Sequence, residues 1–285
     1  RLHLPPDRYR NHGHPLLSLS IASGAIMNGQ TDLLMSAAMV HATVCYIEGK
    51  RNSVALWLGV ALIAKPLAIV MWMLLIATDR KMVVPLVAIL LMVLALPFLM
   101  ASPALAAQQY VDMWHQVVQL APSQEHRFGD INALLRTLGL GIPLKAQIIL
   151  ALVCAVGCLW FWAGSKTRLK EPYRGLMLLA LSTTYLMLLN PRTEGNSYVI
   201  LVPVMATCSA RGLYLRQGAM PVAMAVMCVG LGNSVFGKEI WNLTKLWFKP
   251  VIALVFLGML YTRMIIGSPW RWSHAASDVK NANSE

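Results

Sequence analysis

Lys65 and Pro66 lie midway through an apolar stretch from Val54 to Thr78, in which Lys65 is the only charged residue. A lysine at mid-membrane depth is costly, and such residues usually face a cavity, a partner or a bound anion. The proline removes a backbone donor and breaks the helix. The two remaining arms, Val54–Ala64 and Leu67–Thr78, are each shorter than the ~20 residues that cross a bilayer core. The pattern predicts a hairpin of two short helices with Lys65 at its tip.

Basic residues bracket this hairpin at both ends, with Lys50 and Arg51 before it and Arg80 and Lys81 after it. Short loops rich in Lys and Arg favour the cytoplasmic side of a membrane. We therefore expect the hairpin to rise from the cytoplasmic face and to hold Lys65 near the opposite, outer face. An alternative interpretation is that Lys65 only extends its charged end to the interface.

Polar residues from three further parts of the chain are expected at the same outer face. Gln30 and Asp32 precede an apolar helix, Asp130 and Arg136 lie in the longest polar segment, and Arg192 and Glu194 lie in a polar turn. Polar groups that converge from separate segments are typical of a binding or catalytic cleft. A simpler alternative is that the residues near Asp32 cap the helix and that Arg192 and Glu194 form an exposed pair.

The residue types in this set are suited to phosphate binding and to chemistry at a hydroxyl group. Lys65, Arg136 and Arg192 are candidate phosphate-binding cations. A hydroxyl acceptor needs a carboxylate base, for which Asp32, Asp130 and Glu194 are the available acids. We assign no catalytic residue and no metal ligand. The predicted substrate-binding residues are Gln30, Asp32, Lys65, Arg136, Arg192 and Glu194.

The composition predicts an all-α, polytopic bundle of transmembrane helices. The chain is 57% hydrophobic and 13% charged, with a mean hydropathy of +0.59, and its apolar runs are continuous rather than alternating, which favours helices over a membrane barrel. We expect about ten membrane segments, some short or broken, with both termini inside. A single transmembrane domain over 1–273 would include an outer loop with interfacial helices at 101–146, and a disordered cytoplasmic tail would follow at 274–285.

The membrane segments outside the hairpin are predicted from the remaining apolar runs. They are Leu16–Met27, Leu33–Ile47, Met82–Met100, Ile148–Ala163, Leu176–Leu189, Tyr198–Ala210, Pro221–Phe236 and Val251–Ile266.

The net charge of +12 is surplus positive charge for a membrane protein. Most of it falls in the predicted inner loops, which argues against nucleic acid as a partner. The basic residues predicted on the outer side are better explained by anionic lipid headgroups or by a phosphorylated substrate. The five cysteines lie in apolar runs, where packing is their expected role.

The region from Asn28 to Lys81 resembles the signature region of family 87 glycosyltransferases. The resemblance rests on Asn28-Gly-Gln-Thr-Asp32, then an apolar helix, Gly49-Lys50-Arg51, Lys65-Pro66 and Arg80-Lys81. It covers residues 15–100 best, and it extends more weakly to Ala133–Arg136 and Asn190–Pro203. These proteins are integral membrane enzymes of the GT-C superfamily.

The resemblance implies a hexosyltransferase that uses a polyprenyl-phosphate-linked sugar, often mannose, on the outer face of a bacterial plasma membrane. The acceptor would be a lipid or glycan, no bound cofactor is implied, and a divalent metal requirement stays open. The reaction would be an inverting displacement in which basic residues stabilise the departing phosphate. In this superfamily the catalytic carboxylate lies in a first outer loop, which we expect to precede this sequence in a longer chain.

Two other classes of function remain open from the sequence. Broken helices and intramembrane charges also occur in transporters, so the chief alternative is a polytopic transporter or lipid flippase for an anionic substrate. A non-catalytic subunit of a membrane assembly is the third possibility.

Overall fold

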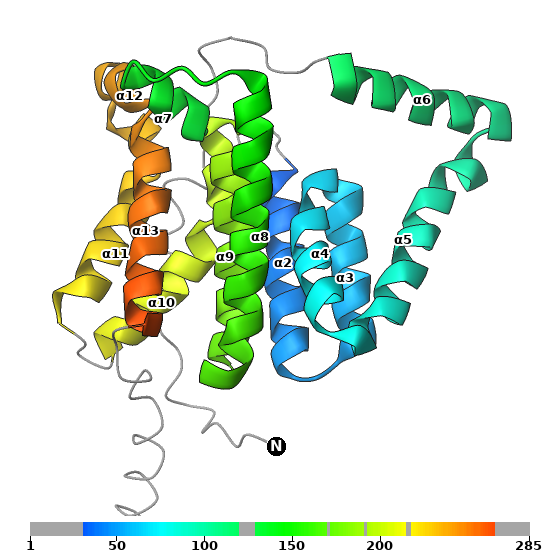
Figure 1. The fold of residues 1–285 in the computed structure, drawn as a ribbon, viewed down its shortest axis with the longest axis horizontal. Coiled ribbons are helices and arrows are strands. Elements are labelled where there is room, and N and C mark those ends of the chain that lie inside the picture. Colours follow the sequence, from blue (N-terminus) through cyan, green and yellow to red (C-terminus); the bar gives the residue numbers. More distant parts are fainter. Residues whose placement is uncertain (1–30, 120–128, 170–171, 191–192, 215–217, 266–285) are drawn as a thin grey trace, which may run out of the picture.

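The computed structural model describes residues 31–119, 129–169, 172–190, 193–214 and 218–265. All regular structure in these ranges is helical, and most of the helices run roughly parallel or antiparallel in one bundle (Figure 1). The predicted N-terminal arm 16–27 and the predicted tail 274–285 lie outside the described residues. The all-α prediction is confirmed for the part of the chain that the structure describes.

The predicted hairpin is present, next to the helix that precedes it. Helix α2 (Asp32–Ile47) packs against α3 (Arg51–Ala64), and a short 3-10 turn, η1 (Pro66–Ala68), leads into α4 (Ile69–Thr78). Gly49 makes the turn between α2 and α3 with a φ of 73°, a conformation that glycine adopts readily. Since α2 and α3 are antiparallel, the beginning of α2 and the tip at Lys65 lie at the same end of the bundle (Figure 1). The basic turns at Lys50 and Arg80 lie at the other end.

Helix α5 (Arg80–Met100) leaves the bundle, and α6 (Pro103–Gln119) crosses beyond its end at a steep angle (Figure 1). Asp79 caps α5 by accepting a hydrogen bond from the Lys81 backbone N–H. The Tyr110 hydroxyl donates to the Leu94 carbonyl over 2.8 Å and joins the two helices. A helix, α6, is thus present within the predicted outer loop 101–146, at the same end of the molecule as Lys65 (Figure 1).

The second half of the chain supplies the remaining helices. α7 (Ile131–Thr137) is a short helix at the end of the bundle where Lys65 lies, and α8 (Leu144–Arg168) and α9 (Tyr173–Leu189) form an antiparallel pair. The predicted segment 198–210 begins instead as a 3-10 turn, η2 (Gly195–Ile200), before α10 (Val202–Tyr214).

The last helices are α11 (Ala219–Gly230), the 3-10 turn η3 (Asn233–Phe236), α12 (Lys238–Thr244) and α13 (Phe248–Ile265). The sequence did not predict α12, because this short segment is not a continuous apolar run.

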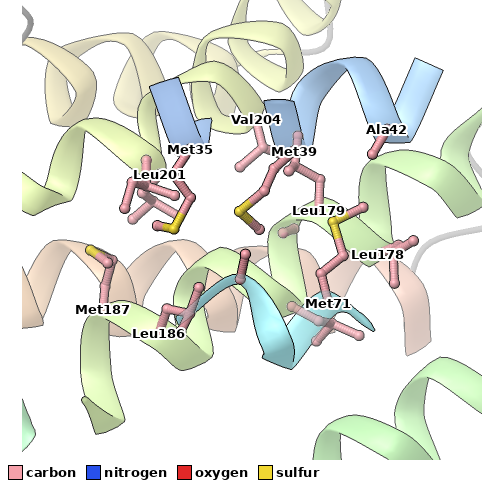
Figure 2. Packing of buried hydrophobic residues seen from close by; sticks show 14 of the residues in the cluster. Met35, Met39, Ala42, Met71, Leu178, Leu179, Leu186, Met187, Leu201 and Val204 are labelled. Carbon is pink, nitrogen blue, oxygen red and sulfur yellow. The ribbon is translucent and has the colours of Figure 1, made fainter. Parts of the chain in front are cut away.

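The core lies where α2, α4, α9 and α10 meet. Figure 2 shows Met35 and Met39 of α2 within one cluster of side chains that includes Met71 of α4, Leu179 of α9 and Val204 of α10. All five are buried. Methionine adapts to irregular gaps between helices, which suits a core built from helices of unequal length.

The prediction of ten membrane segments is not matched by ten full spans. In the part of the chain that the structure describes, two helices are long and apolar enough to cross a membrane, α5 and residues Leu144–Ser165 of α8. The pair of α12 and α13, bent by 61°, could form a third span. The other apolar helices have 10–17 residues, fewer than the ~20 that cross the hydrocarbon core. Side chains along α5 and α8 are largely exposed, as expected for surfaces that face lipid.

Gly59 sets how closely α5 approaches the hairpin. A Cβ atom at this position would lie 2.5 Å from Cγ2 of Ile89 on α5. We expect Gly59→Leu to lower the melting temperature in detergent by several degrees, since overpacking costs about 1–3 kcal/mol. Gly157→Leu on α8 is the matched control, because no atom lies within 4 Å of its Cβ position. Equal effects of the two substitutions would contradict the packing of α3 on α5.

Candidate functional site

The tip of the hairpin presents Lys65 in an extended conformation between two helices. Its φ and ψ are −151° and 127°, as expected for a residue that precedes proline. The Lys65 backbone N–H still donates to the Ala61 carbonyl over 2.9 Å, which completes the last turn of α3. Pro66 opens the η1 turn, where its missing N–H costs nothing. Local sequence therefore fixes the backbone at Lys65.

The Lys65 side chain forms an ion pair with Asp32 at the first turn of α2. Lys65 Nζ lies 2.6 Å from Oδ1 of Asp32. The second carboxylate oxygen, Oδ2, accepts a hydrogen bond of 2.8 Å from the Ser197 hydroxyl. Asp32 is fully buried, whereas 30% of the Lys65 side chain is exposed. The Asp32 carboxylate thus joins the hairpin to the η2 turn.

This arrangement argues against both simple alternatives for these residues, a helix cap at Asp32 and a Lys65 side chain that only reaches the interface. Thr31 makes no side-chain cap hydrogen bond to α2, and the Asp32 carboxylate is used by Lys65 and Ser197 instead. Its position in the first turn still favours a negative charge, because the helix dipole is positive there. Lys65 does not only extend toward an interface, since its charge meets a buried carboxylate.

A second set of contacts ties the segment before α7 to the η2 turn. The Gly129 backbone N–H donates to the Thr193 carbonyl over 2.8 Å, and the buried Tyr198 hydroxyl donates to the Gly129 carbonyl over 2.7 Å. Asp130 caps α7 by accepting a 2.8 Å hydrogen bond from the Ala133 N–H. Burial raises the pKa of Asp130, although this hydrogen bond and the charge of Arg136 act in the opposite direction.

The structure brings some of the predicted site residues together and not others. Asp32 and Lys65 are in direct contact. Arg136 is exposed on α7 and makes no ion pair or hydrogen bond to either of them within the described ranges. Glu194 is exposed at the start of η2, three residues before Ser197. Gln30 and Arg192 lie outside the described residues.

Two residues of this end of the bundle were missed from the sequence. Ser197 is a single hydroxyl-bearing residue in a polar turn, and nothing in the neighbouring sequence identifies it as the partner of Asp32. Lys249 lies at the beginning of α13, only 1% exposed, with Nζ donating to the Gly195 carbonyl over 2.8 Å. The dipeptide Lys249-Pro250 repeats the Lys-Pro pattern of the hairpin tip, and that repetition is the signal that could have identified it.

The chemistry open to this site is the binding of an anion by a lysine of fixed orientation. Lys65 has three N–H donors, and its partial exposure leaves it accessible. Asp32 is poorly placed to act as a base, because it is fully buried and each of its oxygens already has a partner. Among the described residues, no group of three or more His, Cys, Asp or Glu side chains is placed to hold a metal ion.

The ion pair makes a testable contribution to stability. Breaking a buried pair by removing one partner costs about 3–5 kcal/mol, and we expect the lower end because Lys65 is partly exposed. Lys65→Met should lower the melting temperature in detergent more than the double variant Asp32→Asn with Lys65→Met, which leaves no buried charge. The exposed pair of Glu48 and Lys50 is the control, and its double-mutant cycle should show no coupling. Additive effects at Asp32 and Lys65 would contradict the pairing.

Comparison with known proteins places this site within a family. Residues 15–191 match the model of glycosyltransferase family 87, a range that includes Asp32, Lys65 and the α7 segment. No curated protein and no solved structure gives a significant match. The matched range covers well over half of the sequence. The chain, a membrane protein with an ion pair at the break between two short helices, belongs to glycosyltransferase family 87.

Proposed function

We propose that the chain transfers a hexose, mannose being the first candidate, from a polyprenyl-phosphate-linked donor to a hydroxyl group of a lipid or glycan. Membership of the family makes it a glycosyltransferase, and the donor and acceptor classes go beyond that. The observation that carries the proposal is the position of Lys65, a cation held by a buried carboxylate yet partly exposed. It lies at the end of the bundle opposite the basic turns at Lys50 and Arg80 (Figure 1).

Lys65 is suited to bind the phosphate of such a donor. A sugar linked to a polyprenyl phosphate is a phosphodiester with one negative charge, and the departing polyprenyl phosphate gains a second. An ammonium group held beside the phosphate stabilises the second negative charge, which develops in the transition state, in addition to the charge already present in the bound donor. Stabilisation that is stronger in the transition state than in the ground state is the requirement for catalysis. In our proposal, Lys65 contacts the phosphate and is a catalytic residue in this sense.

The proposed step is a single displacement with inversion. The acceptor oxygen attacks the anomeric carbon, and a carboxylate base takes the hydroxyl proton. The bond between the anomeric carbon and the phosphate oxygen breaks, and its electron pair leaves with the polyprenyl phosphate. The step needs no organic cofactor, because the donor carries its own leaving group.

Asp32 has a positioning role in this proposal. Its two contacts hold Lys65 Nζ in one place before the donor binds. A preorganised charge costs little further ordering when the substrate arrives. Since Asp32 is not suited to accept the acceptor proton, we do not assign it as the base. Arg136 and Glu194, both exposed at the same end of the bundle, remain candidates for binding the sugar or the acceptor.

The fold supports placement of this reaction at a membrane surface. α5 and α8 provide spans, and α6, crossing beyond the end of α5, is oriented as a helix that lies in the interface (Figure 1). The basic turns at the far end suit the cytoplasmic side. We propose a multi-pass protein of a bacterial plasma membrane that works on the outer face. No finding supports the alternative of a transporter or lipid flippase.

Sugar transfer by membranes that contain the protein tests the role of Lys65. We expect the double variant Asp32→Asn with Lys65→Met to keep the fold, because it leaves no buried charge, while it lacks the ammonium group. Its kcat/KM for the lipid-linked donor should fall at least 100-fold, about 2.7 kcal/mol of transition-state stabilisation. Lys65→Arg keeps a cation and should retain more activity than the double variant.

Lys238→Met is the matched control for this experiment. Lys238 is exposed at the start of α12, so its removal should leave transfer unchanged. Transfer by the double variant at the unmodified rate would exclude Lys65 from the reaction.

A further inference from the structure

Lys249 is buried at the bend between α12 and α13 without a carboxylate partner. Its side chain is 1% exposed, and no Asp or Glu of the described chain forms an ion pair with it. Nζ donates to the Gly195 carbonyl over 2.8 Å and lies 5.3 Å from the centre of the Trp241 ring. Burial of an unpaired ammonium group is costly, and a carbonyl and an aromatic face repay only part of the cost. A packing role alone does not explain a lysine here.

Glycine at position 195 allows the close approach of the Trp241 ring beside Lys249. A Cβ atom at Gly195 would lie 2.8 Å from Cη2 of Trp241 and 3.6 Å from Nζ of Lys249. A larger residue would force the Trp241 ring or the chain at position 195 to shift, whereas the distance to Lys249 is an ordinary van der Waals contact. Lys249, Trp241 and Gly195 therefore form a tight cluster that sets the position of the first residue of η2.

Gly195 lies two residues before Ser197, whose hydroxyl donates to Asp32. The segment 193–198, here called the strap, is held on one side by Gly129, through the Thr193 carbonyl and the Tyr198 hydroxyl. Lys249 holds it at a separate point, the Gly195 carbonyl. A two-residue spacing leaves little freedom between that point and Ser197. The position of the strap is thus set in part by a lysine more than 180 residues away from Lys65 in the sequence.

We propose that Lys249 is a positioning residue for the transfer reaction. It fixes Gly195, the strap then holds the Ser197 hydroxyl on Asp32, and Asp32 orients Lys65 toward the donor phosphate. The inference rests on the proposed function only for its last step, in which Lys65 meets the donor phosphate. Lys249 lies outside residues 15–191, the range that matches the family model. It does not bind the phosphate itself, because its ammonium group is almost fully enclosed.

The substitution Lys249→Met separates this role from a purely structural one. Methionine keeps an unbranched chain but removes the charge and the hydrogen bond. Loss of an unpaired buried charge is favourable and loss of the bond to Gly195 is unfavourable, so the melting temperature should change little. We expect KM for the lipid-linked donor to rise about tenfold and KM for the acceptor to stay constant. A general loss of folded protein would lower the apparent kcat and leave both KM values unchanged.

A double-mutant cycle between Lys249→Met and Ser197→Ala tests the link itself. If both act through the strap, the double variant should be no worse in donor kcat/KM than the poorer single variant. Ser197→Ala should also lower the melting temperature less in the Lys249→Met background than in the unmodified protein. Lys238→Met, which removes an exposed lysine from α12, should combine with Ser197→Ala additively.

The possible results distinguish failure of the inference from failure of the proposed function. Additive effects of Lys249→Met and Ser197→Ala on both melting temperature and donor kcat/KM overturn the inference. An unchanged donor KM in Lys249→Met does the same, provided that the unmodified protein transfers sugar. If the unmodified protein transfers no sugar while the melting temperatures are coupled, the proposed function fails and the link from Lys249 to Ser197 is retained.

Discussion

The ion pair between Asp32 and Lys65 connects the parts of this protein that matter for its chemistry. A carboxylate buried without a partner would be strongly destabilising. The fully buried Asp32 is therefore tolerated because Lys65, which is partly exposed, supplies the opposite charge. The pair requires that the beginning of α2 and the tip of the hairpin stay at one level of the bundle, which the antiparallel packing of α2 on α3 provides.

The hairpin gives the lysine a position that a continuous helix could not. In an unbroken helix the residue at position 65 would have a helical backbone, and its side chain would project from the side of the helix. The break before Pro66 instead puts Lys65 in an extended conformation between two helix ends. α3 and α4 are each too short to span a bilayer. The tip lies at the end of the bundle where Asp32 contacts Lys65 and Ser197.

The strap extends this organisation into the second half of the chain. Ser197 contacts Asp32, while Gly129 and Lys249 hold neighbouring positions from opposite sides in sequence. Contacts of this kind couple α7, α13 and the hairpin through one short turn. The family match stops at residue 191, so the strap and Lys249 lie beyond it even though they complete the surroundings of Asp32. The ion pair therefore lies within the matched range, whereas Ser197 and Lys249 lie outside it.

Sequence alone determined the local features of this protein and the side of the bundle on which its polar residues lie. The helix break at Lys65, the boundaries of α2 and α5, and the helix after Pro103 follow from proline chemistry and apolar periodicity, which act over a few residues. Only the tertiary structure decided which groups touch. Asp32 and Ser197 are 165 residues apart, and Lys249 is buried where Trp241 of α12 and Gly195 of η2 lie against its ammonium group. The lengths of the spans were also decided there, since a continuous apolar run does not reveal where tertiary packing ends a helix or converts its first turn to a 3-10 turn.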